Sequence, residues 1–234
     1  MIKGVIFDID GTLVDSVDLH AQAWQEAFRH FGHEISFQDI RRQIGKGGDQ
    51  LMPVFLSEDE LKSFGKDLEE FRGELFKKNY LPQVKAFPRV RELFERILSD
   101  NRKIVLASSA KGDELAAYKR IAQIEDLIND ETSSDDVARS KPHPDIFQEA
   151  LEKVGRDVSH DEVIVIGDTP YDAQAAGKLE ISTIGVLCGG FPEIELRGAG
   201  CIAIFRDPAD LLERYEQTPL AVRPLHKVGS GGST

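Results

Sequence analysis

The run Asp8-Ile9-Asp10-Gly11-Thr12, which follows directly on the apolar segment 2–7, constrains this chain more than any other feature. A short apolar, β-branched run that ends in two acids and a glycine predicts a buried strand with polar groups at its end. In open α/β sheets, ligands bind outside the carboxyl ends of the strands. We therefore expect Asp8 and Asp10 to reach such a crevice, where one carboxylate can act as a nucleophile or metal ligand and the other as a general acid or base.

The composition sets limits on partners. With 234 residues, the chain can bury the core of one large domain, or of a core with a smaller insert. Its net charge of −12, from 41 acidic and 29 basic residues, argues against a nucleic-acid partner, which requires a basic surface, but not against a small phosphate ester. Cys188 and Cys201 match no metal or redox spacing. Without a signal peptide or an apolar run of about 20 residues, we expect a cytoplasmic protein with no membrane partner.

Residues 16–82 predict a block of helices without a strand. A helix capped by Asp15 or Ser16 follows Thr12, and a capping box at 57–60 begins another long helix. Two shorter helices are expected at 37–43 and 49–56, on either side of the Gly-rich loop 45–48. The apolar stripe of the first helix comprises Val17, Ala21, Trp24, Ala27, Phe28 and Phe31. Such a block is long enough to form its own small bundle.

Beyond residue 83, strand and helix patterns alternate. Strands are expected at 103–107, 126–129, 162–166, 181–186 and 201–205. Helices are expected at 115–121 and 173–178, and three more are expected to begin at Pro88, at Pro144 and at Asp207-Pro208. This alternation predicts an α/β fold with a doubly wound parallel sheet covered on both faces. Its Rossmann-like core would span 1–15 and 83–228, with the all-helical domain 16–82 inserted after the first strand. The Gly/Ser segment 229–234 is predicted to be a flexible tail.

More polar residues stand where the other strands of this sheet end. They are Ser108 and Ser109 after 103–107, Lys141 just before a helix, and Asp168 and Asp172 after 162–166. In a doubly wound sheet, these strand ends converge on one crevice with Asp8 and Asp10.

With these residues in this order, the chain resembles members of the haloacid dehalogenase superfamily. It is most similar to the branch that contains phosphoglycolate phosphatases and β-phosphoglucomutases, in which a helical cap is inserted after the first strand. The resemblance extends to about residue 215. Most members of this superfamily are phosphatases and phosphotransferases. The resemblance implies that Asp8 attacks phosphorus and becomes an aspartyl phosphate. It also implies that Asp10 protonates the departing oxygen and then takes a proton from the hydrolytic water.

The remaining roles are likewise implied by the resemblance. The phosphate-binding residues would be Gly11, Thr12, Ser108, Ser109 and Lys141. Mg²⁺ would be bound by Asp8, Asp168 and the backbone carbonyl of Asp10, since an all-oxygen site with few carboxylates suits Mg²⁺ better than zinc. Asp172 would support the metal shell or orient Lys141, although capping of its helix is an equal alternative. Each of these residues also has a simpler interpretation when it is taken alone. Single aspartates at strand ends are typical of turns and helix caps, Ser109 would be an ordinary loop residue, and Lys141 would be a solvated surface lysine.

The helical domain is the expected specificity element, with hinges at 12–16 and 81–86. His20 and Lys46 are candidate substrate contacts, with core packing an equal alternative for His20 and the favoured one for Trp24. The loop around Lys46 is not a P-loop, because GxxxxGK[ST] is absent, which argues against a nucleotide triphosphatase.

The leading hypothesis is a monomeric, Mg²⁺-dependent phosphatase of a small phosphorylated metabolite such as phosphoglycolate or a sugar phosphate. The first alternative is a hexose-phosphate mutase. Thr12 is the residue found in phosphatases at that position, and Lys46-Gly47-Gly48-Asp49 replaces the mutase segment Gly-Val-Ser-Arg, whose arginine suits a second phosphate better than lysine does. A metal-independent dehalogenase is disfavoured by Asp10 and Asp168, and a non-catalytic binding protein by the presence of both Asp8 and Asp10.

Overall fold

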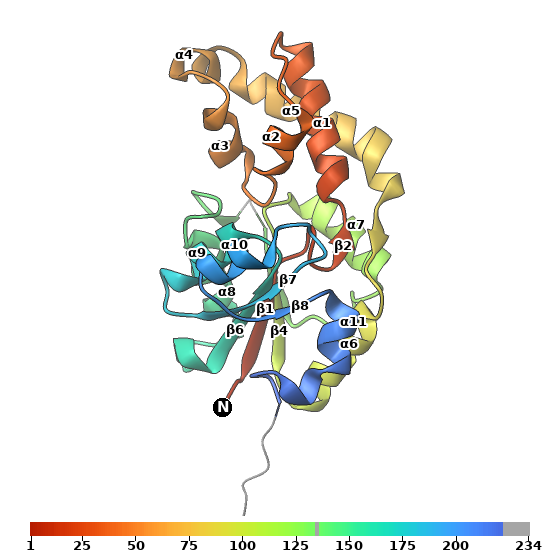
Figure 1. Ribbon diagram of the computed structural model, residues 1–234, viewed down its shortest axis with the longest axis vertical. Helices are drawn as coiled ribbons and strands as arrows, with labels where there is room; N and C mark the ends of the chain where they lie inside the picture. The colour runs from red at the N-terminus through yellow and green to blue at the C-terminus, as the bar shows by residue number, and fades with distance from the viewer. Residues whose placement is uncertain (134–135, 222–234) are drawn as a thin grey trace, which may run out of the picture.

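The computed structural model describes residues 1–133 and 136–221. Within these residues, six parallel strands form one sheet in the order β5-β4-β1-β6-β7-β8 (Figure 1). The strands are β1 (Gly4–Phe7), β4 (Lys103–Ala107), β5 (Asp130–Thr132), β6 (Val163–Gly167), β7 (Ser182–Val186) and β8 (Cys201–Phe205). Phe7 pairs with Leu106 of β4 and with Ile166 of β6, so the carboxyl ends of the three central strands lie side by side. The predicted tail 229–234 and the predicted core end at 228 lie outside the described residues.

Alternation along β1 gives the sheet two apolar faces. Val5 and Phe7 join a cluster on one face, and Ile6 joins a separate cluster on the other. Helices α6 (Val90–Ser99), α7 (Gly112–Ala122) and α11 (Pro208–Glu213) contribute to the first cluster, and α8 (Asp145–Val154) and α9 (Pro170–Gly177) to the second. A smaller cluster lies under α10 (Glu193–Gly198). The predicted α/β fold with a parallel sheet covered on both faces is confirmed.

Between the first strand and the rest of the sheet, the described elements of residues 17–83 are all helical. They are α1 (Val17–His30), α2 (Phe37–Arg41), α3 (Gly48–Leu51), η1 (Met52–Val54), α4 (Glu58–Glu60), η2 (Leu61–Gly65), α5 (Lys66–Leu75), η3 (Phe76–Tyr80) and η4 (Leu81–Gln83). We call residues 16–82 the helical block. Its own apolar core includes Trp24, Phe28 and Leu68, and Figure 1 shows it above the carboxyl ends of the strands.

The two expected hinges pair with each other. β2 (Val14–Asp15) and β3 (Lys85–Ala86) form a two-stranded antiparallel sheet, which the sequence did not predict because each strand has only two residues. The chain therefore enters and leaves the helical block through one short ribbon.

Some predicted boundaries are wrong. The strand expected at 126–129 is β5, four residues later, and α10 was not predicted at all. The helix expected from Pro88 begins at Val90, because Arg89 adopts a left-handed conformation with φ 61°. The helix expected at 49–56 divides into α3 and the 3₁₀ helix η1, which contains Pro53. Two further 3₁₀ helices are η6 (His160–Glu162) and η7 (Tyr215–Gln217).

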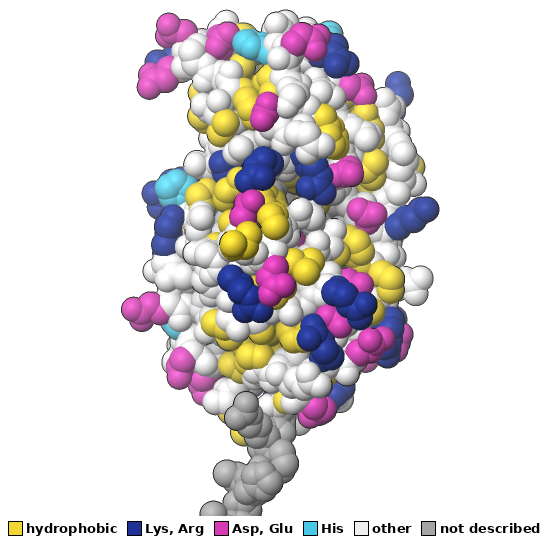
Figure 2. All heavy atoms as spheres, viewed as in Figure 1, with side chains coloured by type: hydrophobic (Ala, Val, Ile, Leu, Met, Phe, Trp, Pro, Cys, Tyr) yellow, Lys and Arg dark blue, Asp and Glu magenta, His cyan; other side chains and the backbone are white. Residues whose placement is uncertain are grey.

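The surface carries charges of both signs. On the face drawn in Figure 2, lysine and arginine side chains are interspersed with aspartate and glutamate. No helix of the described residues is both long and apolar enough to cross a lipid bilayer.

Candidate active site

Asp8 follows β1 directly and is buried together with Lys141 and Asp172. The Lys141 Nζ donates hydrogen bonds to Asp8 Oδ1 and, at 2.8 Å, to Asp172 Oδ1. The other oxygen of Asp172 accepts from the Thr169 hydroxyl at 2.6 Å and the Thr169 backbone N–H at 3.0 Å. Of the roles left open for Asp172, the structure shows two contacts: Asp172 completes the capping box of α9, whose N-cap is Thr169, and it holds Lys141 beside Asp8.

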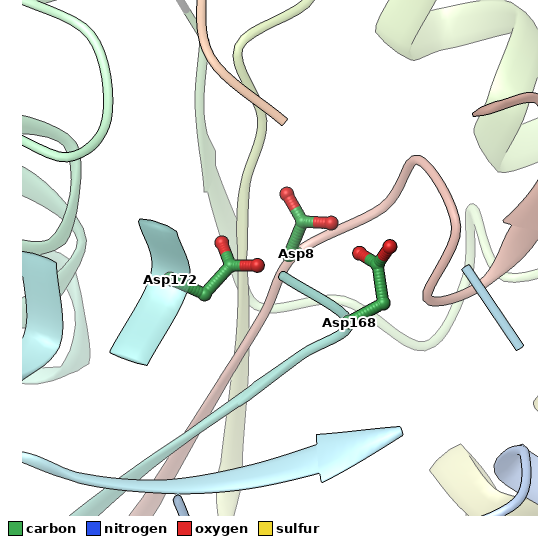
Figure 3. A group of neighbouring side chains, drawn as sticks. All are labelled: Asp8, Asp168 and Asp172. Carbon is green, nitrogen blue, oxygen red and sulfur yellow. The ribbon is translucent and has the colours of Figure 1, made fainter. Parts of the chain in front are cut away.

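Asp168 follows β6 and lies beside Asp8 (Figure 3). The Thr12 hydroxyl lies 3.1 Å from both Asp8 Oδ2 and Asp168 Oδ1 and so links the two carboxylates. Gly11 adopts φ +82°, and a Cβ at this position would lie 2.3 Å from Asp168 Oδ2. The two residues predicted to bind phosphate in the first loop thus contact the acids themselves.

The three aspartates fit a divalent cation. One oxygen of each of Asp8, Asp168 and Asp172 lies within 4.8 Å of the others. Asp168 Oδ2 is buried without a hydrogen-bond partner among the described residues, and a Cβ on Gly189 would lie 1.6 Å from it. A buried carboxylate oxygen without a donor needs another positive partner, and hard oxygen ligands suit Mg²⁺. Asp168 Oδ2 is thus the carboxylate oxygen of this cluster that is left open for a cation, and of its two neighbours Asp8 is the one that also lines the cavity.

The balance of charges in this cluster also favours a bound divalent cation. Burial raises the pKa of Asp8 to about 7; Lys141 opposes this rise, and the nearby Asp172 and Asp10 add to it. Burial and the charges of Asp8 and Asp172 also raise the pKa of Asp168. Although burial lowers the pKa of Lys141, the carboxylates of Asp172 and Asp8 raise it more, so the ammonium form persists. One ammonium among three buried carboxylates leaves an excess of negative charge, which a divalent cation would offset.

Asp10 is held by residues of α1 and its N-terminus. Asp10 Oδ1 accepts hydrogen bonds from Ser16 Oγ at 2.5 Å and His20 Nε2 at 2.9 Å. Burial raises the pKa of Asp10, but His20, Ser16 and Tyr118 together lower it more, and the net shift is downward. Of the two expected caps, Asp15 and Ser16, Ser16 stands at the N-cap of α1, but not through its side chain. Its hydroxyl makes no capping bond to α1, because it is directed to Asp10 instead.

His20 packs in the core and also contacts Asp10, while its contact with substrate stays a prediction. Its ring is buried and stacked on Phe76, with centroids 4.0 Å apart, while its Nε2 contacts Asp10. Nδ1 lies 2.8 Å from Arg72 Nη2. A guanidinium can only donate, so Nδ1 accepts and Nε2 carries the proton directed at Asp10. Arg72 and Tyr118, whose hydroxyl lies 2.9 Å from Nε2, come from distant elements, and no local sequence signal marks them.

A cavity of about 470 Å³ lies between the strand ends and the helical block. Asp8, Asp10 and Lys141 line it from the sheet core. Of the two serines after β4, Ser109 lines this cavity; Ser108 is fully buried, and its Oγ accepts from the backbone N–H of Ala110 at 3.0 Å.

From the helical block, the predicted residues His20 and Lys46 line the cavity. Lys46 Nζ donates to Gln43 Oε1 at 2.6 Å and lies 4.7 Å from the centroid of the Tyr171 ring. Trp24 belongs to the apolar core of the block, which was the favoured prediction for it, and it also borders the cavity.

This constellation can be compared with known families. The profile of the family described as haloacid dehalogenase-like hydrolase matches residues 5–186, which include all of the acids described above. The chain belongs to this family. A solved structure of a hydrolase from Pseudomonas syringae is similar in fold, with a TM-score of 0.82 and 30% identity over 92% of this chain and 98% of that one.

Two curated relatives of this haloacid dehalogenase-like hydrolase carry the names of phosphatases. A phosphorylated carbohydrates phosphatase of Thermotoga maritima is 27% identical, covering 90% of this chain and 97% of the relative. A phosphoglycolate phosphatase of Nitrosospira multiformis is 26% identical, covering 75% of this chain and 78% of the relative. The family and these names support a phosphoric monoester hydrolase.

Proposed function

We propose that this hydrolase is a Mg²⁺-dependent phosphatase that cleaves a small phosphomonoester through an aspartyl phosphate on Asp8. The observation that carries this proposal is the environment of Asp8. A buried carboxylate at a strand end, held by the ammonium of Lys141 and the hydroxyl of Thr12, faces a cavity large enough for a metabolite. Such a group is fixed in position and desolvated, which suits attack on phosphorus.

The chemistry uses the two halves of the Asp-x-Asp pair in turn. An Asp8 oxygen forms a bond to phosphorus as the ester oxygen leaves with a proton from Asp10. Asp10 then accepts a proton from the water that attacks the acyl phosphate, which releases inorganic phosphate and restores Asp8. The hydrogen bonds to Ser16 and His20 favour the carboxylate form of Asp10, which is the form that this second step needs.

Charge compensation divides between a side chain and the metal. Lys141 lies against Asp8 and can offset negative charge on the transferred phosphoryl group, with Ser109 at the same edge of the cavity. A Mg²⁺ ion held by Asp8, Asp168 and the Asp10 carbonyl would reduce the repulsion between an anionic nucleophile and an anionic ester. The unpartnered oxygen of Asp168 supports this assignment.

The helical block is proposed to select the leaving group, with the ribbon of β2 and β3 as its hinge. Phosphoglycolate and sugar phosphates remain the substrate candidates, in line with the names of the two relatives. A mutase has less support, because Lys46, the residue available to clamp a second phosphate, is already engaged by Gln43 and Tyr171.

The covalent step provides the decisive test. The protein would be mixed with Mg²⁺ and a phosphate-labelled p-nitrophenyl phosphate and quenched in acid within one turnover. We expect label on the wild-type protein, lost on treatment with hydroxylamine, and none on Asp8→Asn. Mg²⁺-dependent turnover in Asp8→Asn at the wild-type rate would exclude the mechanism. Absence of hydrolysis of any phosphomonoester by the wild type would exclude the function.

A further inference from the structure

On the side of the helical block, part of the wall of the cavity is formed where the start of α3 meets α5. Gly48 and Glu69 both line the cavity there, next to Trp24. A Cβ on Gly48 would lie 2.6 Å from Glu69 Oε1 and 3.4 Å from the Trp24 ring. The carboxylate of Glu69 therefore occupies the space that a side chain at position 48 would fill.

Glu69 differs from the other acids on this side of the cavity because it makes no hydrogen bond or ion pair within residues 1–133 and 136–221. Glu70 lies 3.7 Å from Lys66, and Glu74 lies 3.8 Å from Lys77. Asp49 accepts a hydrogen bond from the backbone N–H of Ser140. The half-buried carboxylate of Glu69 is thus left to interact with whatever enters the cavity.

None of the nearby cations forms an ion pair with this carboxylate within the described residues. Arg72 contacts His20 and lies over the rings of Trp24 and Phe76. Lys77 forms a 2.7 Å ion pair with Asp113. The remaining lysines that line the cavity outside the catalytic set are Lys46, which bonds Gln43, and Lys111, which is exposed and therefore screened by solvent.

We propose that Glu69 is a specificity-determining residue. It selects phosphomonoesters whose leaving group presents hydrogen-bond donors, and it rejects those with a second anionic group. An ionised carboxylate can only accept hydrogen bonds, so a hydroxyl or an ammonium group satisfies it. A carboxylate or second phosphate at the same place would meet a like charge, which is an effective means of exclusion. This inference rests on the proposed phosphatase function and favours polyol and amino-alcohol phosphates over phosphoglycolate.

Esters that differ only in their terminal group test this inference. A short pair is 2-hydroxyethyl phosphate and 2-phosphoglycolate, and a longer open-chain pair is sorbitol 6-phosphate and 6-phosphogluconate. O-phosphoethanolamine supplies the ammonium arm and separates selection for a cation from selection for a hydroxyl. We expect kcat/KM of the wild type with Mg²⁺ to favour the hydroxyl ester over its carboxylate partner by at least about tenfold in one of the pairs.

Two variants give the test its control. Glu69→Gln keeps the size of the side chain and removes its charge, so the preference should fall to within about threefold. Asp67→Asn removes the same charge from an exposed position of α5 and should keep the wild-type preference. An even or inverted preference in both pairs, or a preference that survives Glu69→Gln, would overturn the inference while hydrolysis of p-nitrophenyl phosphate still supports a phosphatase. If no ester is hydrolysed, the proposed function falls as well.

Discussion

The two sides of the cavity hold their polar groups in opposite ways. On the side of the sheet core, Lys141, Asp168 and Asp172 are at most 1% exposed, and one lysine is shared between two aspartates. On the side of the helical block, Glu69 is half-buried and has no partner among the described residues. Groups proposed for chemistry are thus fixed by other protein groups, whereas the group proposed for selection is left free for the substrate.

Because the two sides hold their polar groups differently, substitutions on each side should have different effects on stability and on substrate specificity. Removing one member of a buried ion pair leaves an uncompensated charge and costs about 3–5 kcal/mol. Removing a partially exposed, unpaired carboxylate leaves no such charge. Substitutions on the core side should therefore change turnover of every substrate and often the stability, and those on the other side should change the relative rates of different substrates.

Asp8→Asn is expected to have the largest effect on activity without harm to the fold. Loss of the nucleophile should lower kcat for p-nitrophenyl phosphate by roughly 10⁴-fold or more. Because the change removes one negative charge from a site with an excess of buried carboxylates, Tm measured in EDTA should equal or exceed that of the wild type. A drop in Tm would instead mean that the ion pair of Asp8 with Lys141 stabilises the fold by more than the surplus buried charge destabilises it.

Lys141→Met should lower both the stability of the fold and the rate of turnover. It leaves Asp8 and Asp172 without their shared cation, so unfolding should become easier by about 3–5 kcal/mol and kcat should fall by about 10²–10³-fold. Thermal unfolding and steady-state kinetics measure these effects. Lys46→Met, a matched change in the helical block, should leave Tm almost unchanged. Equal losses of stability in both variants would contradict the comparison.

Metal removal should change turnover and stability only through residues on the core side of the cavity. EDTA should abolish turnover and excess Mg²⁺ should restore it, because the carboxylates of Asp8 and Asp168 lack a sufficient counter-charge. A ligand present at about 100 times its Kd stabilises the folded state by ~2.7 kcal/mol, so Mg²⁺ should also raise Tm. Asp168→Asn should abolish that rise. A Tm that is insensitive to Mg²⁺ in the wild type would argue against a metal at this place.

The same contrast explains what could be predicted from the sequence. Asp8, Asp168 and Lys141 stand beside strand or helix ends, and parallel strands bring such ends together, so local patterns sufficed to place them in one site. Ser16 stands at the N-cap of α1 as one of the two expected caps, but the sequence could not show that Asp10 competes for its hydroxyl. Arg72 and Glu69 were missed because their roles depend on how α5 packs against α1 and α3, which no local pattern encodes.

Arg72→Met, which removes the donor, tests a boundary between the two sides, because Arg72 acts on Asp10 only through His20. Loss of its bond to Nδ1 frees the imidazole to change its tautomer, so kcat should fall by about tenfold, with KM changing little. Arg72→Lys, which retains a donor, should recover part of the rate. A change in KM without a change in kcat would instead place Arg72 among the residues that bind the leaving group.

Arg42→Gln should have the smallest effect. The Arg42 guanidinium joins the helical block to Glu195 of α10 at 3.1 Å, but it is 60% exposed, and exposed ion pairs contribute little. The Tyr171 hydroxyl bonds the backbone carbonyl of Arg42, so this second link between the two parts survives the substitution. We expect KM to rise by no more than about twofold and kcat to stay constant, in low salt and high salt alike.

A large fall in kcat for Arg42→Gln would mean that closure of the helical block limits turnover. The block would then control the rate of reaction for every substrate, and the division between a chemical side and a selecting side of the cavity would no longer hold. Constant kcat across Arg42→Gln, together with altered substrate preference in Glu69→Gln, would restrict the influence of the helical block to the choice of leaving group.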